Sequence, residues 1–273
     1  MGSGACSGED VPETVGTVRV AVPVSPIAGL VRALAPRGDL DVVVMVPVGS
    51  NPATHAPSIR DQRRAAEATL FLEIGHPAFV FESTWLDGIL DGSSAERVVL
   101  FENCPVLDED PHVWLSVSCL SAAAAVTAEA LGRLFPAEND EISANLRRFD
   151  ERLAAASESV DQRLRGHEGK SFVVLHPAWG YFARDHGLRQ VEILSHASGD
   201  PGAARLAELI RAGRDEGVST VFTQPQFNSA PAEIVADELG AGTAVLDPLQ
   251  EDPIQILEEA AAALVHAFEA RTP

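Results

Sequence analysis

Four side chains in this sequence of 273 residues stand out as candidate metal ligands. His55, His112 and His176 offer imidazole nitrogens, and Asp247 offers a carboxylate. Three imidazoles and one carboxylate are a donor set that suits a divalent transition metal. Long stretches of chain separate the four positions, so no local spacing rule joins them. Only the fold can bring them together, and the elements that carry them therefore decide whether a site exists.

Short apolar runs rich in β-branched residues predict the strands that would position these side chains. The runs cover residues 18–24, 41–46, 70–74, 98–101, 171–175, 191–194, 218–223 and 243–246. Helical patterns alternate with them, which predicts parallel sheets covered on both faces. His55 lies in the loop after the second run, and His176 and Asp247 directly follow their runs. Ligands bind beyond the carboxyl ends of such strands, where we expect all of these side chains to lie.

The pattern of alternating strands and helices is interrupted between His112 and about residue 165. Residues 113–134 predict an alanine-rich helix, which Phe135-Pro136 ends. Residues 138–165 then predict one amphipathic helix with a single apolar stripe, and such a helix would span roughly 40 Å. We therefore predict an α/β protein in which two α/β lobes with parallel sheets are joined by one long backbone helix. The expected parts are a flexible tail (1–16), a first lobe (17–137), the linking helix (138–166) and a second lobe (167–273).

This division places His55 and His112 in the first lobe and His176 and Asp247 in the second. The expected metal position is the cleft between the lobes.

The remaining histidines compete for the same role. His76 and His196 also follow predicted strands, so each is a candidate ligand or a neighbour of one. His167 and His266 lie on polar or helical segments and are expected in solvent. His186 ends a helix before a glycine, where a cation is favourable. Glu82 stands near an expected helix start, and capping and packing explain it.

Signatures of covalent chemistry are absent from the sequence. It contains no G-x-S-x-G nucleophile elbow, no G-x-G-x-x-G and no phosphate-binding loop of the Walker type. The chain carries 40 acidic and 20 basic residues, a net charge of −20 that should repel nucleic acid and anionic lipid headgroups. We expect a binding protein and not an enzyme, with no nucleic-acid partner.

The cysteines and the N-terminus leave two questions open. No uninterrupted apolar stretch is long enough to predict a membrane span. The first sixteen residues are small and polar, and they read as a tag or scar before a mature N-terminus. Cys6 follows Gly4-Ala5 and resembles the lipidated cysteine of a processed lipoprotein, although a stray thiol explains it as well. Cys104 and Cys119 form no C-x-x-C motif, and the sequence does not decide whether they pair.

Four motifs resemble those of one family, the zinc- and manganese-binding solute-binding proteins of bacterial ABC transporters. They are DPHVWLS (110–116), PVGSNPATHAPS (47–58), LHPAWGYFARDHGL (175–188) and VLDPL (245–249). The resemblance runs from about residue 18 to residue 248. It implies two α/β lobes joined by one long helix, with a metal held at their interface. Carried over position by position, the implied ligands are His55, His112, His176 and Asp247.

Two departures from the family pattern concern the loops. The first histidine of the family usually follows Asp-Pro directly, whereas here Ala53-Thr54 separates Asn51-Pro52 from His55. A histidine-rich loop that often precedes the DPHVWL motif is replaced by PVLDED. In manganese-type relatives the third ligand tends to be Glu, so His176 favours Zn²⁺ as the bound ion, with Mn²⁺ as the alternative.

The resemblance implies a monomeric receptor at the periplasmic or extracellular face of the cell membrane. It would bind a divalent metal ion and deliver it to the membrane permease of an ABC transporter, with a lipid anchor at Cys6 as an option. Two alternatives remain: a receptor of the same architecture for a chelated metal such as a siderophore or cobalamin, and a class II chelatase-like enzyme. Aromatic residues make up only 5% of the chain, with one tyrosine, and this composition counts against both.

Overall fold

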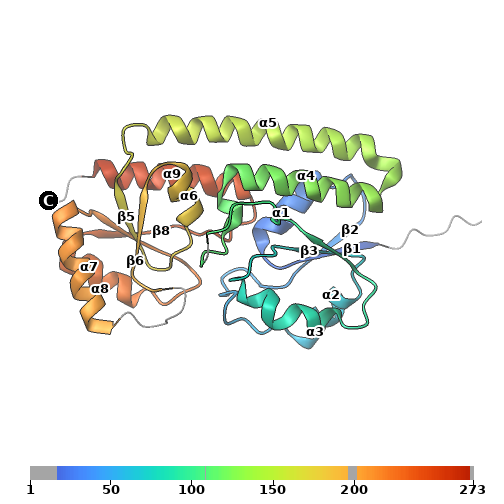
Figure 1. Ribbon diagram of the computed structural model, residues 1–273, viewed down its shortest axis with the longest axis horizontal. Coiled ribbons are helices and arrows are strands. Elements are labelled where there is room, and N and C mark those ends of the chain that lie inside the picture. Colours follow the sequence, from blue (N-terminus) through green and yellow to red (C-terminus); the bar gives the residue numbers. More distant parts are fainter. Residues whose placement is uncertain (1–16, 108, 196–201, 271–273) are drawn as a thin grey trace, which may run out of the picture.

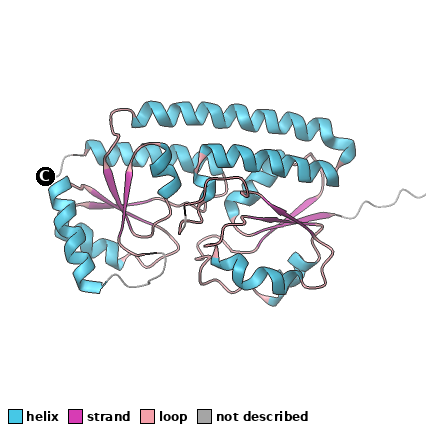
Figure 2. Cartoon of the chain, in the orientation of Figure 1, coloured by secondary structure: helices cyan, strands magenta, loops and turns pink. Residues whose placement is uncertain are grey.

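The computed structural model describes residues 17–107, 109–195 and 202–270, arranged as two α/β lobes beneath one long helix (Figure 1). Each lobe contains one four-stranded parallel sheet (Figure 2). The architecture predicted from the sequence is therefore confirmed. Cys6 and His196 lie outside the described residues.

The first lobe is built on a sheet with the strand order β2-β1-β3-β4. Its strands are β1 (Val18–Val22), β2 (Leu40–Val44), β3 (Leu70–Glu73) and β4 (Glu96–Val99). Its helices are α1 (Ser25–Leu34), α2 (Ile59–Ala66) and α3 (Asp87–Leu90), the last preceded by a π-helical turn at Glu82–Leu86. The central strands β1 and β3 are the most buried, which explains their nearly continuous apolar sequences.

The second lobe repeats this plan with the strand order β6-β5-β7-β8. Its strands are β5 (Ser171–Val174), β6 (Arg189–Glu192), β7 (Thr220–Thr223) and β8 (Gly242–Val245). Its helices are α6 (Gly180–Asp185), α7 (Gly202–Glu216), α8 (Ala230–Leu239) and α9 (Pro253–Glu269). The two sheets thus share one topology, and each chain crossover returns to a parallel strand.

The long helix α5 (Asn139–Leu164) lies across both lobes, with α9 and α4 (Val117–Leu134) beneath it (Figure 1). The apolar stripe that the sequence predicted on α5 is buried, as shown by Ile142, Phe149 and Leu153. Asp252 caps the first turn of α9 and also pairs with Arg152 of α5 at 2.5 Å, which fixes the two helices side by side. The sequence prediction of a long linking helix is confirmed.

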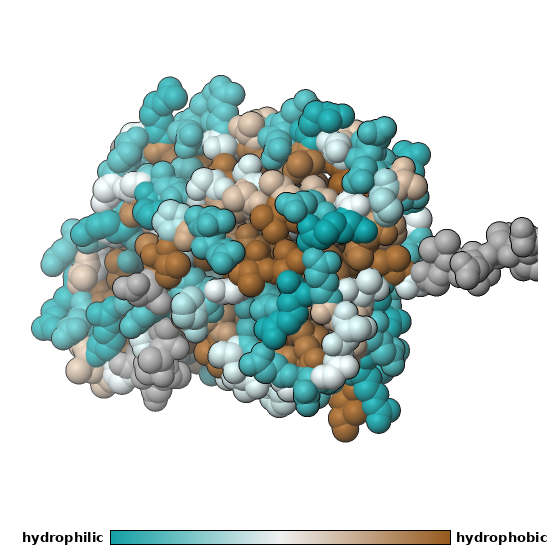
Figure 3. Space-filling view, turned by 45° about the vertical axis from the view of Figure 1, so that its right-hand side comes forward, coloured by the Kyte–Doolittle hydropathy of each residue, from teal (hydrophilic) through white to brown (hydrophobic). Residues whose placement is uncertain are grey.

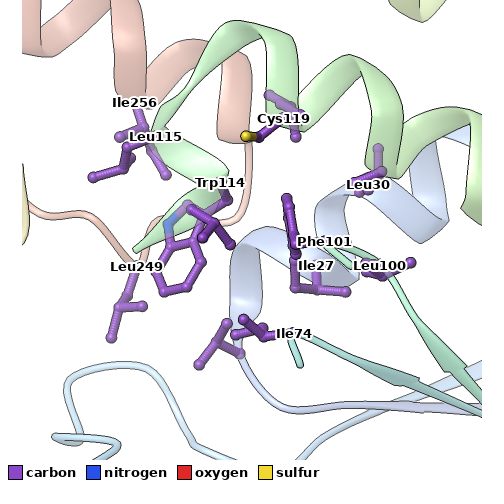
Figure 4. Packing of buried hydrophobic residues seen from close by; sticks show 14 of the residues in the cluster. Ile27, Leu30, Ile74, Leu100, Phe101, Trp114, Leu115, Cys119, Leu249 and Ile256 are labelled. Atoms are coloured by element: carbon purple, nitrogen blue, oxygen red, sulfur yellow. The ribbon is translucent and has the colours of Figure 1, made fainter. Parts of the chain in front are cut away.

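One hydrophobic core extends through both lobes. Trp114 is fully buried at its centre, close to Leu249 and Ile256 from the second half of the chain and to Ile27 from the first (Figure 4). The indole nitrogen of Trp114 donates to the carbonyl of Pro248 at 2.8 Å. A smaller cluster, which includes Val173, belongs to the second lobe alone. The lobes are therefore joined by shared packing as well as by α5.

Helix α4 is, among the described residues, the one helix long and apolar enough to cross a membrane by length and composition alone. It contacts α1 and α5 and buries residues such as Leu120 and Leu131. This packing accounts for its apolar composition. The surface around the lobes is mainly hydrophilic on the face shown in Figure 3, with apolar residues between the polar ones.

The element boundaries differ from the sequence prediction at the edges of the sheets. Strand β4 was expected at 98–101 and β6 at 191–194, but both begin and end two residues earlier. Both are edge strands, and their charged first residues join the ladder although they are exposed. The apolar residues that follow, such as Leu100 and Ile193, are buried beyond the strand end. The expected helix at 113–134 was also wrong in one detail, because Ser116 is extended and separates a short 3₁₀ turn from α4.

Candidate metal centre

Two of the four predicted ligands lie next to each other at the junction of the lobes. The ring centroids of His112 and His176 are 5.4 Å apart, with an angle of 73° between the ring planes. Both side chains line a cavity of about 350 Å³, together with Asn51, Pro52 and Ala53. These last three belong to the loop that carries His55. Chain segments that follow strands of both sheets therefore meet at one cavity.

His112 is held by a neighbouring carboxylate. Oδ1 of Asp110 accepts hydrogen bonds from the backbone N of His112 at 3.0 Å and from its ring Nδ1 at 2.7 Å. An imidazole that donates through Nδ1 presents Nε2 as its free lone pair, which is the usual arrangement of a metal-binding histidine. The ring also meets the edge of Trp114, with centroids 5.2 Å apart. His112 is buried, so its orientation is fixed on several sides.

Asp110 also ties the first lobe to the second. Its other oxygen, Oδ2, accepts from the backbone N of Gly180 at 3.0 Å. A Cβ atom at Gly180 would lie 2.5 Å from this oxygen, so only glycine permits the contact. Nearby, the backbone N of Leu107 donates to the hydroxyl of Tyr181 at 2.9 Å. The sequence analysis missed this role of Asp110, although its position two residues before His112 was visible.

His176 and Asp247 are both contacted by the turn that follows β7. The ring of Phe227 stacks on His176 with a centroid distance of 4.5 Å and an interplanar angle of 23°. The side-chain amide of Gln226 donates to Oδ1 of Asp247 at 2.8 Å, and the backbone N of Leu249 donates to the same oxygen at 3.0 Å. Sequence reasoning gave no signal for either contact, because both depend on tertiary packing.

His55 occupies a turn that Asn51 organises. The carbonyl of Asn51 accepts from the backbone N of His55 at 2.9 Å, and its side-chain oxygen accepts from the backbone N of Ala53. Nε2 of His55 is buried and has no hydrogen-bond partner in the described part of the chain. A buried imidazole nitrogen normally has a partner, so this atom has the chemistry of a candidate metal ligand. The extra residues Ala53-Thr54 are accommodated within the turn.

The four predicted ligands do not form one group in the structure. Within residues 17–107, 109–195 and 202–270, no three His, Cys, Asp or Glu side chains are arranged to hold a metal ion. Only the proximity of His112 and His176 is observed. The complete set of four ligands therefore stays a prediction.

Three other described histidines, His76, His186 and His167, have structural contacts. Nδ1 of His76 accepts from the backbone N of Ala78 at 3.1 Å, so this ring shapes the turn that brings Ala78 to the cavity. His186 lies 3.0 Å from the carboxylate of Asp161 on α5. His266 is exposed as expected. The expectation for His167 was wrong, because its ring packs on Phe268 with centroids 5.3 Å apart.

Glu82 lies at the start of a helical turn, as expected, but its carboxylate caps the end of β3 and not the helical turn. Its carboxylate accepts from the backbone N of Ile74 at 2.6 Å and of Gly75 at 2.9 Å. Burial raises the pKa of Glu82 to about 7, while these two hydrogen bonds favour the charged form and lower it. The carboxylate fixes the turn that leads to His76.

A disulfide joins Cys104 to Cys119, which answers one question that the sequence left open. The closed segment contains Asp110, His112 and Trp114. The covalent link therefore anchors both ends of the chain that carries the best-defined ligand candidate.

Comparison with known proteins identifies a matching family. The model of the family "Zinc-uptake complex component A periplasmic" (ZnuA) matches residues 20–267. The chain is 26% identical to the high-affinity zinc uptake system protein ZnuA of Yersinia pestis, over 87% of this chain and 85% of that protein. It is 25% identical to the zinc-binding lipoprotein AdcA of Streptococcus pneumoniae, over 90% of this chain and 52% of that protein, so it spans about half of that relative.

A solved structure gives the same result. The crystal structure of a zinc-bound ZnuA deletion mutant superimposes with a TM-score of 0.85 at 29% identity, and the match covers 93% of this chain and 99% of that one. The likeness thus includes both lobes and the long helix.

Proposed function

This chain belongs to the ZnuA family of periplasmic zinc-uptake components, and on that premise we propose that it is an extracytoplasmic receptor for a divalent transition metal, with zinc as the main cargo. It binds the ion between its lobes and delivers it to the permease of an ABC transporter. The observation that carries this proposal is the pair of His112 and His176 at the lobe junction, one from each lobe. The named zinc-binding relatives support it.

The donor chemistry supports zinc as cargo, with manganese second. Imidazole nitrogens suit zinc, whereas manganese prefers a site richer in oxygen. His112 already has the carboxylate partner that fixes the tautomer of a metal ligand. The orphan Nε2 of His55 adds a third nitrogen whose burial is otherwise unexplained.

The proposed ligands are His55, His112, His176 and Asp247. The loop of His55 lines the same cavity as the two central histidines, and the turn that stacks on His176 also holds Asp247. The ion gathers these groups, because the attraction of a divalent cation offsets the cost of moving two loops. Binding thus draws the loop at 47–58 and the segment after β8 toward the central pair.

The same ligand set argues against catalysis at this site. A catalytic zinc keeps one coordination position open for water or substrate. Four protein ligands fill a tetrahedral zinc and leave no such position. The receptor therefore binds and releases its cargo without covalent chemistry.

The remaining features of the proposal concern location and partners. The family description places its members in the periplasm, and one relative is named a lipoprotein. We propose the outer face of the cell membrane as the site of action, a monomeric state, and a lipid anchor at Cys6.

Elemental analysis of the purified protein tests the proposal. The protein is purified without added metal and analysed for zinc and manganese, in parallel with His112→Ala. We expect roughly one zinc ion per wild-type chain, as a single four-ligand site requires, and loss of that zinc in the variant. His266→Ala is the matched control, because His266 is exposed on α9 far along the chain from the cavity residues.

The outcome that overturns the proposal is equally specific. If the wild-type protein contains no metal and gains no thermal stability from zinc or manganese, the four residues are not a metal site. Binding of a metal chelate without binding of the free ion would replace the proposal by a receptor for chelated metal. Insertion of metal into a porphyrin would replace it by a chelatase.

A further inference from the structure

The side chain of Gln224, which directly follows β7, is buried without a hydrogen-bond partner for either of its polar atoms. Gln224 is only 4% exposed. Neither Oε1 nor Nε2 forms a hydrogen bond with any residue that the structure describes. A buried carboxamide is normally satisfied on both sides, because leaving it unpaired costs stability. The missing hydrogen-bond partner of this carboxamide is best explained as a group that enters the site together with the bound ligand.

The position of Gln224 in the second sheet places it between two proposed ligands. Strand β7 lies between β5 and β8, so the three carboxyl ends are neighbours. The backbone N of Leu175 donates to Phe222, and the backbone N of Leu246 donates to Thr223. Gln224 follows Thr223 directly, just as His176 follows Leu175 and Asp247 follows Leu246. In the register of the sheet, Gln224 is therefore level with His176 and with Leu246, and Asp247 lies one residue beyond Leu246 at the same edge.

Gln224 also begins the turn that contacts both of these ligands. Its carbonyl accepts from the backbone N of Phe227 at 3.2 Å, which closes the turn. Phe227 stacks on His176, and Gln226 donates to Asp247. The buried carboxamide thus stands at the base of the element that holds the second-lobe half of the site.

We propose that Gln224 is a specificity-determining residue of the metal site, whose amide oxygen accepts a hydrogen bond from a water molecule bound to the ion. This inference rests on the proposed function. Four protein ligands complete the tetrahedral shell of zinc, which needs no water. Manganese takes a larger, oxygen-rich shell and keeps water ligands in such a site. Gln224 therefore lets the receptor hold manganese in addition to zinc.

The test compares the affinities of Gln224→Leu and wild-type protein for Zn²⁺ and Mn²⁺, measured by competition with a metal-binding dye. We expect the affinity for Mn²⁺ to fall about tenfold or more, the lower end of the usual effect of losing a partner of a metal-bound group. The affinity for Zn²⁺ should change by less than about threefold, because zinc sheds that water.

A second readout separates this role from a structural one. Leucine removes two unpaired polar atoms from the interior, so the metal-free Gln224→Leu protein should melt about 2–4 °C above the wild type. A glutamine that supports the fold through hydrogen bonds would give the opposite change. If leucine prevents folding, the unbranched Gln224→Met carries the same expectations.

Two control variants sharpen the result. Gln224→Glu keeps an acceptor oxygen at the same place, so it should bind Mn²⁺ at least as tightly as the wild type. Gln255→Leu makes the same chemical change at an exposed position on α9 and should alter neither affinity.

The inference is overturned if Gln224→Leu binds Mn²⁺ as the wild type does, or loses both ions equally. It is also overturned if Gln224→Glu loses Mn²⁺. A wild-type protein that binds neither ion is a different outcome, which contradicts the proposed function itself.

Discussion

At the scale of single residues, Asp110 connects the candidate ligand to the rest of the molecule. One of its oxygens holds both the ring and the backbone of His112, and the other accepts from Gly180 in the second lobe. The carboxylate therefore fixes the tautomer of His112 and the spacing between the lobes at the same time. A ligand oriented in this way loses little freedom when it binds a metal.

Replacing Asp110 by asparagine tests this orientation. Asparagine preserves the size of the side chain but removes the charge that favours Nδ1–H of His112. We expect Asp110→Asn to weaken zinc binding about 10- to 100-fold, as is typical for such partners, while the protein stays folded. The affinity is measured by competition with a chelating dye.

The matched control for this change is Asp161→Asn, which removes the carboxylate beside His186, a histidine outside the proposed site. Zinc affinity should be unchanged in this variant. Equal losses in the two variants would show that the effect of Asp110→Asn is general and does not act through His112.

The raised pKa of Glu82 predicts how the stability of the protein depends on pH. Burial raises this pKa to about 7 in the folded protein, above the ordinary value of 4.5 for a glutamate side chain. The folded state then binds more protons at this group than the unfolded state does between these values, so the contribution of Glu82 to stability is greatest below pH 4.5 and is lost as the pH rises to about 7. The glutamine of Glu82→Gln is neutral throughout. Between pH 4.5 and 7, the free energy of unfolding of this variant should therefore fall by up to about 3 kcal/mol less than that of the wild type.

Urea unfolding of both proteins at several pH values measures this difference. Glu129→Gln provides the control, because Glu129 is exposed on α4. A wild-type profile parallel to that of Glu82→Gln would contradict the raised pKa.

Only part of the candidate site could be predicted from single residues. His112 was found because it directly precedes a predicted helix, and His176 because it directly follows a predicted strand. The contacts of Asp110 with Gly180, of Phe227 with His176 and of Gln226 with Asp247 could not be predicted. They join segments far apart in the chain, and no local pattern contains information about such pairs.

At the scale of elements, the segment closed by the disulfide between Cys104 and Cys119 provides polar contacts between the lobes. Leu107 bonds to Tyr181, Asp110 to Gly180 and Ser116 to Asp185, the last at 2.6 Å. Trp114 reaches the carbonyl of Pro248 from the same segment. One segment of the first lobe thus bonds to α6 at three residues and to the segment after β8.

Removal of the disulfide should weaken both the fold and the site. The cysteines are 15 residues apart, and closing a loop of this length typically stabilises a protein by about 3 kcal/mol. We expect the double variant Cys104→Ser, Cys119→Ser to lose roughly this much in urea unfolding. Its zinc affinity should also fall, since His112 becomes less restrained.

Reductant distinguishes the cross-link from the substitution. The wild-type protein in dithiothreitol should resemble the double variant, and the double variant should not respond to dithiothreitol. Unchanged stability of the reduced wild type would contradict the prediction.

The central elements of the fold were more predictable than its edges. Strands β1 and β3 are buried, so their apolar sequences mark them clearly. The edge strands β4 and β6 begin with exposed charged residues. The apolar run in each sequence extends past the end of the strand, into residues that are buried but not paired. Apolar sequence reports burial, whereas pairing in a ladder also includes polar residues, so the two boundaries differ.

At the scale of the whole molecule, two sheets of identical topology share one core. Helix α5 contacts α1 and α4 of the first half and α9 of the second, and the pairs Arg152–Asp252 and Arg32–Glu251 add links between the halves of the chain. Surface ion pairs of this kind contribute little, so the shared core provides most of the coupling. A large hinge rotation would have to break this core.

The expected response to cargo is therefore local, which hydrogen exchange can test. Zinc should slow amide exchange in the loop at 47–58, in the turn at 224–227 and after β8, because these segments carry the proposed ligands and their neighbours. The buried faces of α5 and α9 should exchange at nearly the same rate with and without zinc, apart from the uniform stabilisation that any ligand gives. The zinc-free His112→Ala protein provides the baseline for non-specific effects of the ion. A change in protection concentrated in α5 or at its contact with α9 would instead indicate a rigid-body rotation of the lobes, and the shared core would then have to come apart when the cargo binds.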